Sequence, residues 1–432
     1  MSLSVVIGLI ASVILVLGGV SIAAAFGLGS FGIAYFLNID IETVFSTMVS
    51  RIDSPALIAL PLFIYMGVLA EKSGQGERLV NFMELFVGRF KGGLGTVIVV
   101  ACALFGAISG AGSAAIASVG TVLMPRAVAL GYPREYLVSL VACSSILTLL
   151  IPPSIPLLIL ALTMQISVGA AFLTTLVPGL VTATGYIILN HIFVRKFKIT
   201  TVSYGDKQEF FADFKRKGKS ASLVLLLPVV VLGGIYGGIA SPTEAAGFGV
   251  VYVIVLALFV YKSLSFREFF RTTMISGDLL GSLIIMISAL TLLSTVLVYE
   301  GTPFALAELV TNNFEQWQAL LLINLILLVM GMIMDDISGS IVAASVLYPI
   351  AQELGIDPLQ FAAIVGVNLG VGNITPPVAP LLFMSSAVAG NVPMQKYVGY
   401  VFKFIIFVNI PVLLLVTFWP DFSLFLPRVL GY

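Results

Sequence analysis

Apolar runs long enough to cross a lipid bilayer follow one another along the chain, from about residue 4 to residue 418. A membrane-spanning helix needs about 20 predominantly apolar residues, and short polar stretches separate the runs. Hydrophobic residues make up 59% of the chain and charged residues 10%, whereas soluble globular chains carry about 25% charged residues. The pattern predicts an all-α polytopic membrane protein and excludes a water-soluble enzyme.

Charges on the polar stretches predict which side of the membrane each stretch faces. Residues 195–219 hold eight lysines and arginines against three aspartates and glutamates, and short loops rich in these bases stay in the cytoplasm. From this anchor, alternation of the spans places nearly all of the 21 basic residues at the cytoplasmic face, with Arg51 and Arg428 as exceptions. The N-terminus is then expected on the outer, periplasmic side.

A re-entrant hairpin is expected between two cytoplasmic segments. Residues 71–91 mix charged and apolar side chains, which is typical of an amphipathic arm helix at the membrane surface, and the loop at 126–134 is basic. Residues 94–125 between them must therefore enter and leave the membrane on one side. Three glycines lie at the middle of this stretch, at positions 106, 110 and 112. Such irregular backbone survives at membrane depth where protein buries it or where it lines a cavity. Packing of small residues between two helices is the alternative.

An internal repeat accounts for the second half of the chain. A shift of 224 residues lays residues 150–158 on residues 374–382 and matches three prolines and two leucines without a gap. Prolines interrupt helices, so 136–166 and 359–388 are predicted to be broken membrane helices. The helix-breaking prolines are Pro152, Pro153 and Pro156 in the first copy and Pro376, Pro377 and Pro380 in the second.

The second copy is predicted to face the opposite way. Its arm, residues 300–318, carries three glutamates and no lysine or arginine, so we expect it outside, followed by a hairpin at 319–349. Two inverted repeats, 1–194 and 220–432, are then joined by the cytoplasmic linker 195–219. Such repeats are typical of secondary transporters, in which freed carbonyls bind a cation and the N-termini of half-helices bind an anion.

Polar residues at the hairpins and helix breaks are the candidates for binding ions or substrate. Asp335 and Asp336 lie at the second hairpin tip. Carboxylates inside a membrane are usually functional, although they could instead cap the helix that follows. An intramembrane aspartyl protease is disfavoured because adjacent helical residues diverge by about 100°. Neutral oxygens near the breaks suit sodium, and they come from Thr148, Ser154, Asn368, Gly372, Asn373 and Thr375.

The sequence lacks the residues that other classes of function need. The sequence has no P-loop for a nucleotide, no nucleophile–base set for catalysis and no basic patch of the kind that nucleic acid needs. His191 is the single histidine, and Cys102 and Cys143 lie inside apolar runs, which argues against a transition-metal site and against a disulfide. A channel would show a continuous polar lining, whereas the polar residues form two mid-membrane clusters. We expect neither an enzyme nor a bound cofactor.

Three stretches together resemble one family of transporters. They are residues 150–156, residues 233–246 and residues 335–378, the last of which contains Asn-Leu-Gly-Val-Gly-Asn-Ile-Thr-Pro-Pro at 368–377. The chain is similar here to the large membrane subunit, of DctM type, of the tripartite ATP-independent periplasmic (TRAP) transporters. The resemblance runs from about residue 54 to residue 389.

This resemblance implies a function and a set of partners. It implies a sodium-driven, elevator-type importer of organic acids, such as C4-dicarboxylates or sugar acids, in the cytoplasmic or inner membrane of a bacterium or archaeon. A soluble periplasmic binding protein of DctP type would deliver the substrate, and a small four-helix membrane subunit of DctQ type would brace the large one. We expect both partners to be separate chains, with sodium as the coupling ion.

The resemblance also implies where sodium and substrate bind. Hairpin tips and broken helices form these sites in the family, and the matching positions are Ser109, Gly110, Gly112, Ser113, Thr148, Asp335, Asn368, Gly372 and Thr375. Four neighbouring residues complete the candidate set, namely Ser154, Ser338, Gly339 and Asn373.

The chain departs from the family pattern in both hairpins and at one helix break. Many relatives carry an aspartate where this chain has Ala115 and a Gly-Pro pair at Thr148-Leu149, and prolines are common where Asp336 and Ser338 stand. These departures point to an unusual substrate or ion stoichiometry. The alternative function is a stand-alone sodium/divalent-anion or citrate-type symporter, which needs no binding protein.

Overall fold

The computed structural model describes residues 2–52, 55–87, 90–200 and 207–432, and within these ranges the chain forms helices and turns without a strand. Eight helical segments of the described chain are at least 18 residues long and apolar enough to cross a membrane. Shorter apolar helices add to them, among them α6 (Gly93–Ser109) and α20 (Pro358–Gly372). The structure confirms the predicted all-α polytopic class.

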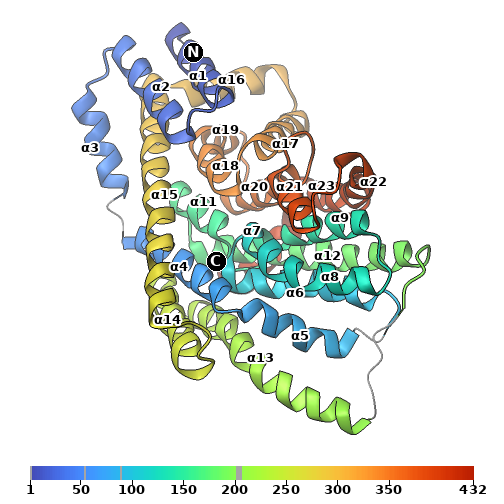
Figure 1. Cartoon of the computed structure of the whole chain (residues 1–432). Coiled ribbons are helices and arrows are strands. Elements are labelled where there is room, and N and C mark those ends of the chain that lie inside the picture. Colours follow the sequence, from blue (N-terminus) through green and yellow to red (C-terminus); the bar gives the residue numbers. More distant parts are fainter. Residues whose placement is uncertain (1, 53–54, 88–89, 201–206) are drawn as a thin grey trace.

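Helices from the start of both halves form one flank of the molecule, which we call the scaffold (Figure 1). Within it, α2 packs on α1 and α15, α4 packs on α14 and α15, and α13 packs on α14. The scaffold helices are α1 (Leu3–Leu17), α2 (Ile22–Phe36), α3 (Ile41–Ile52), α4 (Ala59–Lys72), α13 (Lys207–Tyr236), α14 (Pro242–Val255) with η3 (Leu256–Val260), and α15 (Phe266–Glu300).

Two scaffold helices begin at capping boxes. Before α14, the Glu244 backbone N–H donates to Ser241 Oγ at 3.3 Å and the Ser241 N–H donates to Glu244 Oε2 at 2.8 Å. Ser265 and Glu268 form the same pair of bonds at the start of α15. Each box satisfies N–H groups that the first turn of a helix leaves without partners.

The two hairpins and the two broken helices form a second group. The first hairpin is α6, α7 (Gly112–Ala115), η2 (Ile116–Gly120) and α8 (Thr121–Ala129), and the first broken helix is α9 (Arg134–Ser145), α10 (Leu147–Leu150) and α11 (Ile155–Met164). The second hairpin is α17 (Gln316–Ile333), α18 (Asp336–Val342), η4 (Ala343–Leu347) and α19 (Tyr348–Glu353), and the second broken helix is α20 and α21 (Pro380–Val388). The peptide bonds Pro152–Pro153 and Pro376–Pro377 within the breaks are both cis.

Arm helices and further membrane helices complete the fold. They are α5 (Gln75–Val87), α12 (Val168–Val194), α16 (Thr302–Asn313), α22 (Met394–Phe404), η5 (Ile405–Asn409), α23 (Ile410–Phe418) and α24 (Pro420–Val429). Each hairpin runs further than the sequence predicts, to Ala129 rather than 125 and to Glu353 rather than 349. The reason is that α8 and α19 accommodate Pro125 and Pro349.

Helix bounds repeat at the same offset as the prolines. The helix after the first hairpin tip begins at Gly112 and its counterpart begins at Asp336, which is 224 positions later. The broken helices begin at Arg134 and Pro358, and α12 and α23 end at Val194 and Phe418, again 224 positions apart. Helices of the two halves thus begin and end at equivalent positions in these three places.

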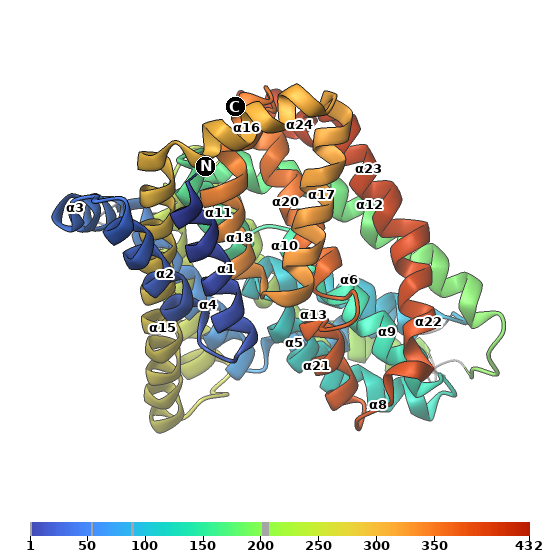
Figure 2. The same ribbon diagram turned by 90° about the horizontal axis from the view of Figure 1, so that it is seen from above.

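Parts that the charges assign to different sides of the membrane lie at opposite edges of the molecule. In Figure 2, α16 and α24 lie at the top of the view, near both chain termini, and α8 and α21 lie at the bottom. Two copies of opposite orientation require such a separation of the acidic arm from the basic loop at 126–134. The orientation of each edge relative to the membrane stays a prediction.

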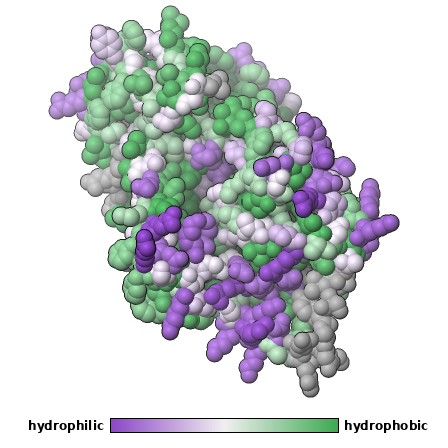
Figure 3. All heavy atoms as spheres, in the orientation of Figure 1, coloured by the Kyte–Doolittle hydropathy of each residue, from purple (hydrophilic) through white to green (hydrophobic). Residues whose placement is uncertain are grey.

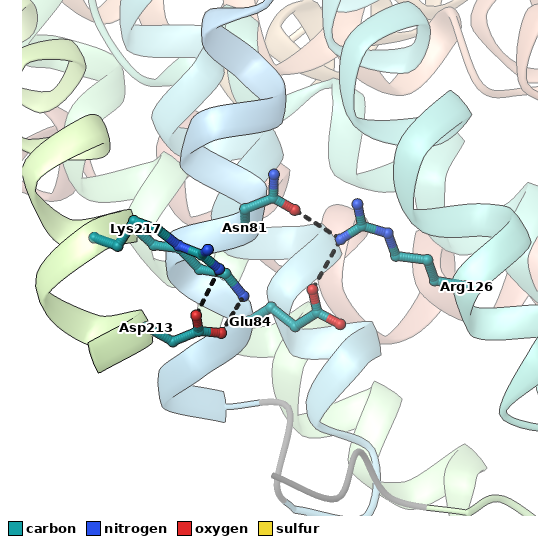
Figure 4. Close-up of polar contacts among 6 residues, drawn as sticks. Asn81, Glu84, Arg126, Asp213 and Lys217 are labelled. Atoms are coloured by element: carbon teal, nitrogen blue, oxygen red, sulfur yellow. Dashed lines mark hydrogen bonds and ion pairs between the residues drawn. The ribbon is translucent and has the colours of Figure 1, made fainter. Parts of the chain in front are cut away.

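The first arm packs between a hairpin and the scaffold. Helix α5 contacts α6 on one side and α13 on the other, and Arg126 of α8 bonds Asn81 Oδ1 at 2.8 Å and Glu84 Oε2 at 2.9 Å (Figure 4). Asp213 of α13 pairs with Arg216 and Lys217 nearby. In Figure 3 hydrophilic side chains gather in this lower region, while hydrophobic ones cover much of the remaining visible face. The arm predicted at 71–91 is therefore shorter in the structure, because α4 continues to Lys72 and the arm helix itself is Gln75–Val87, which packs against protein on two sides, while residues 88–89 lie outside the described residues.

Close backbone contacts hold the first helix of each hairpin against a broken helix. A Cβ atom on Gly372 of α20 would lie 2.5 Å from Gly331 Cα of α17, and one on Gly106 of α6 would lie 2.6 Å from Thr148 Cα of α10. We expect Gly372→Ala to destabilise the protein by about 1–3 kcal/mol through overpacking. The melting temperature of the purified protein in detergent measures this loss.

Gly281→Ala provides the matched control, because Gly281 lies within α15 and a Cβ atom there would meet nothing within 4 Å. Equal melting temperatures for Gly372→Ala, Gly281→Ala and the unsubstituted protein would contradict a close contact at Gly372.

Candidate functional site

One cavity lies where both hairpin tips meet both helix breaks. Its volume is about 190 Å³, which is below the roughly 300–1,000 Å³ of sites for drug-sized ligands and suits a small ligand. The lining residues come from both repeats and are Gly110, Ala111, Gly112, Ser113, Ile155, Pro156, Asp335, Asp336, Ile337, Asn373, Pro380, Leu381 and Met384. No lysine, arginine or histidine is among the residues that line this cavity in the described chain.

The first hairpin tip is held against the first helix break by its backbone. Gly110 ends α6 in a left-handed conformation with φ 64°, which glycine adopts without a steric penalty. The Ile155 N–H donates to the Gly110 carbonyl at 3.3 Å, and a Cβ atom on Gly110 would lie 2.8 Å from the Pro153 carbonyl oxygen. The next helix starts at Gly112 without a side-chain cap, and Gly112 and Ser113 of its first turn both line the cavity.

Asp335 caps the helix that follows the second tip. Its carboxylate accepts bonds from the Ile337 N–H at 3.1 Å and the Ser338 N–H at 3.4 Å, and the Ser338 hydroxyl also donates to it. An aspartate at this position satisfies N–H groups of the first turn and complements the positive end of the helix dipole. The capping role, which the sequence left as an alternative, is therefore present at Asp335.

Asp336 faces the second broken helix instead. It is half-buried, and its Oδ1 accepts a hydrogen bond from Asn373 Nδ2. The same amide nitrogen donates to the Leu369 carbonyl at 3.0 Å, so two acceptors fix the orientation of the Asn373 amide group. Asn373 is 1% exposed, and its Oδ1 has no partner within the described structure.

Other residues of the predicted site lie outside the cavity lining. Their hydroxyl groups bond carbonyls three or four residues earlier in the chain, as in Ser109 to Phe105, Thr148 to Ser145 and Thr375 to Val371. Asn368 is fully buried and donates to Asn324 Oδ1 of α17 at 2.6 Å, and Thr417 of α23 donates to the same oxygen at 3.2 Å. This amide cluster joins three helices of the second repeat away from the tips.

The remaining predicted residues have packing contacts or an unused hydroxyl. A Cβ atom on Gly339 would lie 2.8 Å from Leu369 Cδ2, so this glycine permits close packing of α18 on α20. Ser338 Oγ lies 3.0 Å from Met286 Sδ of α15, which places a scaffold side chain beside the second tip. The Ser154 side chain is 1% exposed and its Oγ has no partner among the described residues.

Prolines in the breaks remove specific hydrogen-bond donors. Pro152 and Pro153 have no N–H for the carbonyls of Thr148 and Leu149, four residues earlier. In the second break, the Thr375 N–H bonds the Gly372 carbonyl at 2.9 Å and the Leu381 N–H bonds the Asn373 carbonyl at 3.3 Å. The two breaks therefore differ, because in the second one nearby N–H groups replace the lost donors.

The structure brings part of the predicted set together and adds residues that the sequence missed. Gly110, Gly112, Ser113, Asp335 and Asn373 share the cavity wall. No pattern in the sequence pointed to the apolar members Ile155, Leu381 and Met384, because their types are common throughout the membrane helices. The sequence marks Asp336 as one of an acidic pair and as a departure from the family pattern, and its position against Asn373 distinguishes it from Asp335.

Hairpin tips and helix breaks that enclose a small cavity within a polytopic bundle define a membrane transporter. The family described as "Tripartite ATP-independent periplasmic transporter, DctM component" matches residues 9–422, and the chain belongs to this family. The match extends beyond the region from 54 to 389 that carries the sequence resemblance.

Individual relatives agree with this assignment, and one solved structure shares the fold. The C4-dicarboxylate TRAP transporter large permease protein DctM of Rhodobacter capsulatus is 32% identical over 447 residues, which is 100% of both chains. The protein of the same name from Pseudomonas aeruginosa is 35% identical over 87% of both chains, and the sialic acid large permease SiaM of Vibrio cholerae is 32% identical over 89% of both. The fold is similar to the Alcanivorax borkumensis YdaH transporter, with a TM-score of 0.62, 16% identity and 89% of both chains covered.

The capping role of Asp335 makes a prediction about stability. Asp335→Ala removes the acceptor for the first N–H groups of α18 and should destabilise the protein by about 1 kcal/mol, whereas Asp335→Asn should retain most of the stability because asparagine also caps helices. Melting temperatures of the two purified variants measure the difference. Equal melting temperatures for the alanine and asparagine variants would contradict the capping role.

Proposed function

We propose that the chain is the permease subunit of a sodium-coupled, binding-protein-dependent importer of organic acids, and that it has no catalytic activity of its own. It would lie in the inner membrane of a bacterium or archaeon, with residues 195–219 in the cytoplasm and the N-terminus in the periplasm. The observation that carries the proposal is the cavity of about 190 Å³ that both hairpin tips and both helix breaks line.

Sodium and the substrate would use different groups at this place. The uncapped start of the helix at Gly112 offers N–H groups and a partial positive charge to a carboxylate of the substrate. Carbonyls freed by Pro152 and Pro153, with the unused hydroxyl of Ser154, offer oxygen ligands for sodium. Binding of both sodium and the substrate would hold the first tip against the helix breaks. The tip already contacts the first break there, because the Gly110 carbonyl accepts a hydrogen bond from the Ile155 N–H.

Alternating access would follow an elevator mechanism. The hairpins and broken helices pack on one another, with α17 on α20, α11 on α18 and α21 on α9, so they are suited to move as one body. The scaffold helices α4 and α15 touch this body at the first tip and the second tip, respectively. The contacts there are Gly67 against Ser109 and Met286 against Ser338.

Membership of a tripartite family supports two partners for this chain. A small four-helix membrane subunit would brace the scaffold, whose outer helices carry many exposed apolar side chains such as Phe270 and Met274 of α15. A soluble periplasmic binding protein would deliver the acid to the outer face. The C4-dicarboxylate and sialic acid relatives make organic acids the substrate class to test first.

Reconstitution tests this function directly. The chain, a small subunit and a binding protein from the same organism are placed in liposomes, and uptake of a panel of labelled organic acids is followed with and without an inward sodium gradient. We expect uptake that falls to background when either sodium or the binding protein is left out.

Two results would contradict the proposal. Sodium-driven uptake by this chain alone would identify a stand-alone symporter. Uptake of the same rate with a potassium gradient in place of the sodium gradient would exclude sodium coupling.

A further inference from the structure

The oxygen-rich wall of the cavity offers hydrogen-bond acceptors and needs a donor. Asp336 contributes a carboxylate, which can accept hydrogen bonds from roughly four directions. Asn373 Nδ2 donates one of these bonds. Asn373 is also among the lining residues, and its Oδ1 is buried and has no partner in the described chain. A buried acceptor without a donor is unfavourable, so this pair of side chains is incomplete until a donor enters the cavity.

The charge of the cavity leads to the same conclusion. Two aspartates line it, and no basic side chain is among its lining residues within the described structure. Asp335 is occupied by the N–H groups that it caps, whereas Asp336 faces the cavity beside Asn373. A negative group half-buried inside a membrane protein is stabilised by a positive partner, and a substrate with two carboxylates would add to the negative charge instead.

The remaining lining favours an organic cation over a bare ion. Asp336 and Asn373 line this cavity, and so do the apolar residues Ile155, Leu381 and Met384. A hard cation takes oxygen ligands on several sides. An alkylammonium or amidinium group needs acceptors at its nitrogen and apolar surface along its carbon chain, which is what this cavity provides.

We propose that Asp336 and Asn373 form a subsite for a cationic nitrogen of the transported acid, so that the substrate is a zwitterion with one carboxylate and one ammonium or amidinium group. The carboxylate would lie at the uncapped helix start at Gly112, and the nitrogen would lie between Asp336 and Asn373 Oδ1. This inference rests on the proposed function and specifies the substrate class for the same cavity.

Matched pairs of acids test the substrate class. The probes are γ-aminobutyrate against succinate and 5-aminovalerate against glutarate, since each pair differs mainly in whether the far end is an ammonium or a carboxylate, and ectoine is added as an amidinium acid. Binding to the binding protein is measured first by thermal shift, and sodium-driven uptake by the reconstituted three-component system follows. We expect binding and uptake of zwitterions and not of their dianionic counterparts.

The Asp336→Asn variant tests whether the charge of Asp336 binds the cationic nitrogen of the substrate. It keeps the shape of the side chain and removes its charge, so uptake of the zwitterion should fall at least about tenfold through loss of a charge-assisted contact, with the sodium concentration for half-maximal uptake unchanged. Asp357→Asn is the matched control, because Asp357 caps α20 at its other end, outside the cavity lining. Asp336→Gly serves as a second variant, since the first repeat carries Gly112 at the equivalent position.

Three outcomes would overturn the proposal. Uptake of dianions only would show a different substrate class, and the proposed import function would still stand. A rise in the sodium requirement of Asp336→Asn, with uptake restored at high sodium, would make Asp336 a ligand of the coupling ion. Absence of sodium-driven uptake of any acid would overturn both this inference and the proposed function.

Discussion

Inside a bilayer a backbone N–H or C=O group has no water to bond, and this constraint governs the whole architecture. A helix satisfies these groups within itself, so a chain can interrupt its membrane helices only where surrounding protein covers the interruption. Here the chain interrupts four helical elements, at Gly110–Ala111, at 151–154, at Met334–Asp335 and at 373–379. The four interruptions lie together, and their contacts cover much of the broken backbone, as where the Ile155 N–H bonds the Gly110 carbonyl and where Gly331 packs on Gly372. The cavity is the small volume that this arrangement leaves.

The two hairpin tips end one helix and start the next with different residues, glycine in the first repeat and aspartate in the second. The first tip uses the left-handed Gly110 and leaves the following helix start uncapped, whereas the second tip uses Asp335 to cap α18. One wall of the cavity therefore presents N–H groups and the other presents carboxylates. An ancestral duplication would give the two walls equal chemistry, and the substitutions at 335, 336 and 373 make them unequal. This asymmetry is the basis for a substrate that carries both signs of charge.

The sequence predicted the membrane class, the hairpins, the breaks and the 224-residue offset, because proline, glycine and charge have strong positional effects that need no tertiary information. Five residues of the predicted site share the cavity, and their types fit a break or a tip. The positions of Asn368 and Thr148 could not be predicted in the same way. Their side chains bond Asn324 and the Ser145 carbonyl, and only the packing of α20 on α17 and the local turn of α10 determine those partners. The different roles of Asp335 and Asp336 likewise depend on where α18 begins, since a shift of one residue would exchange them.

Protection of a single cysteine tests the central claim, that the cavity between the tips and breaks is the transport site. Ser113 is exposed and lines the cavity, while both natural cysteines, Cys102 and Cys143, are fully buried. A Ser113→Cys variant should react with a hydrophilic maleimide in detergent, and the transported acid with sodium should slow that reaction. Ser222→Cys on the exposed face of α13 should react at a rate that neither ligand changes. Labelling of Ser113→Cys that is equally fast with and without substrate and sodium would contradict the account.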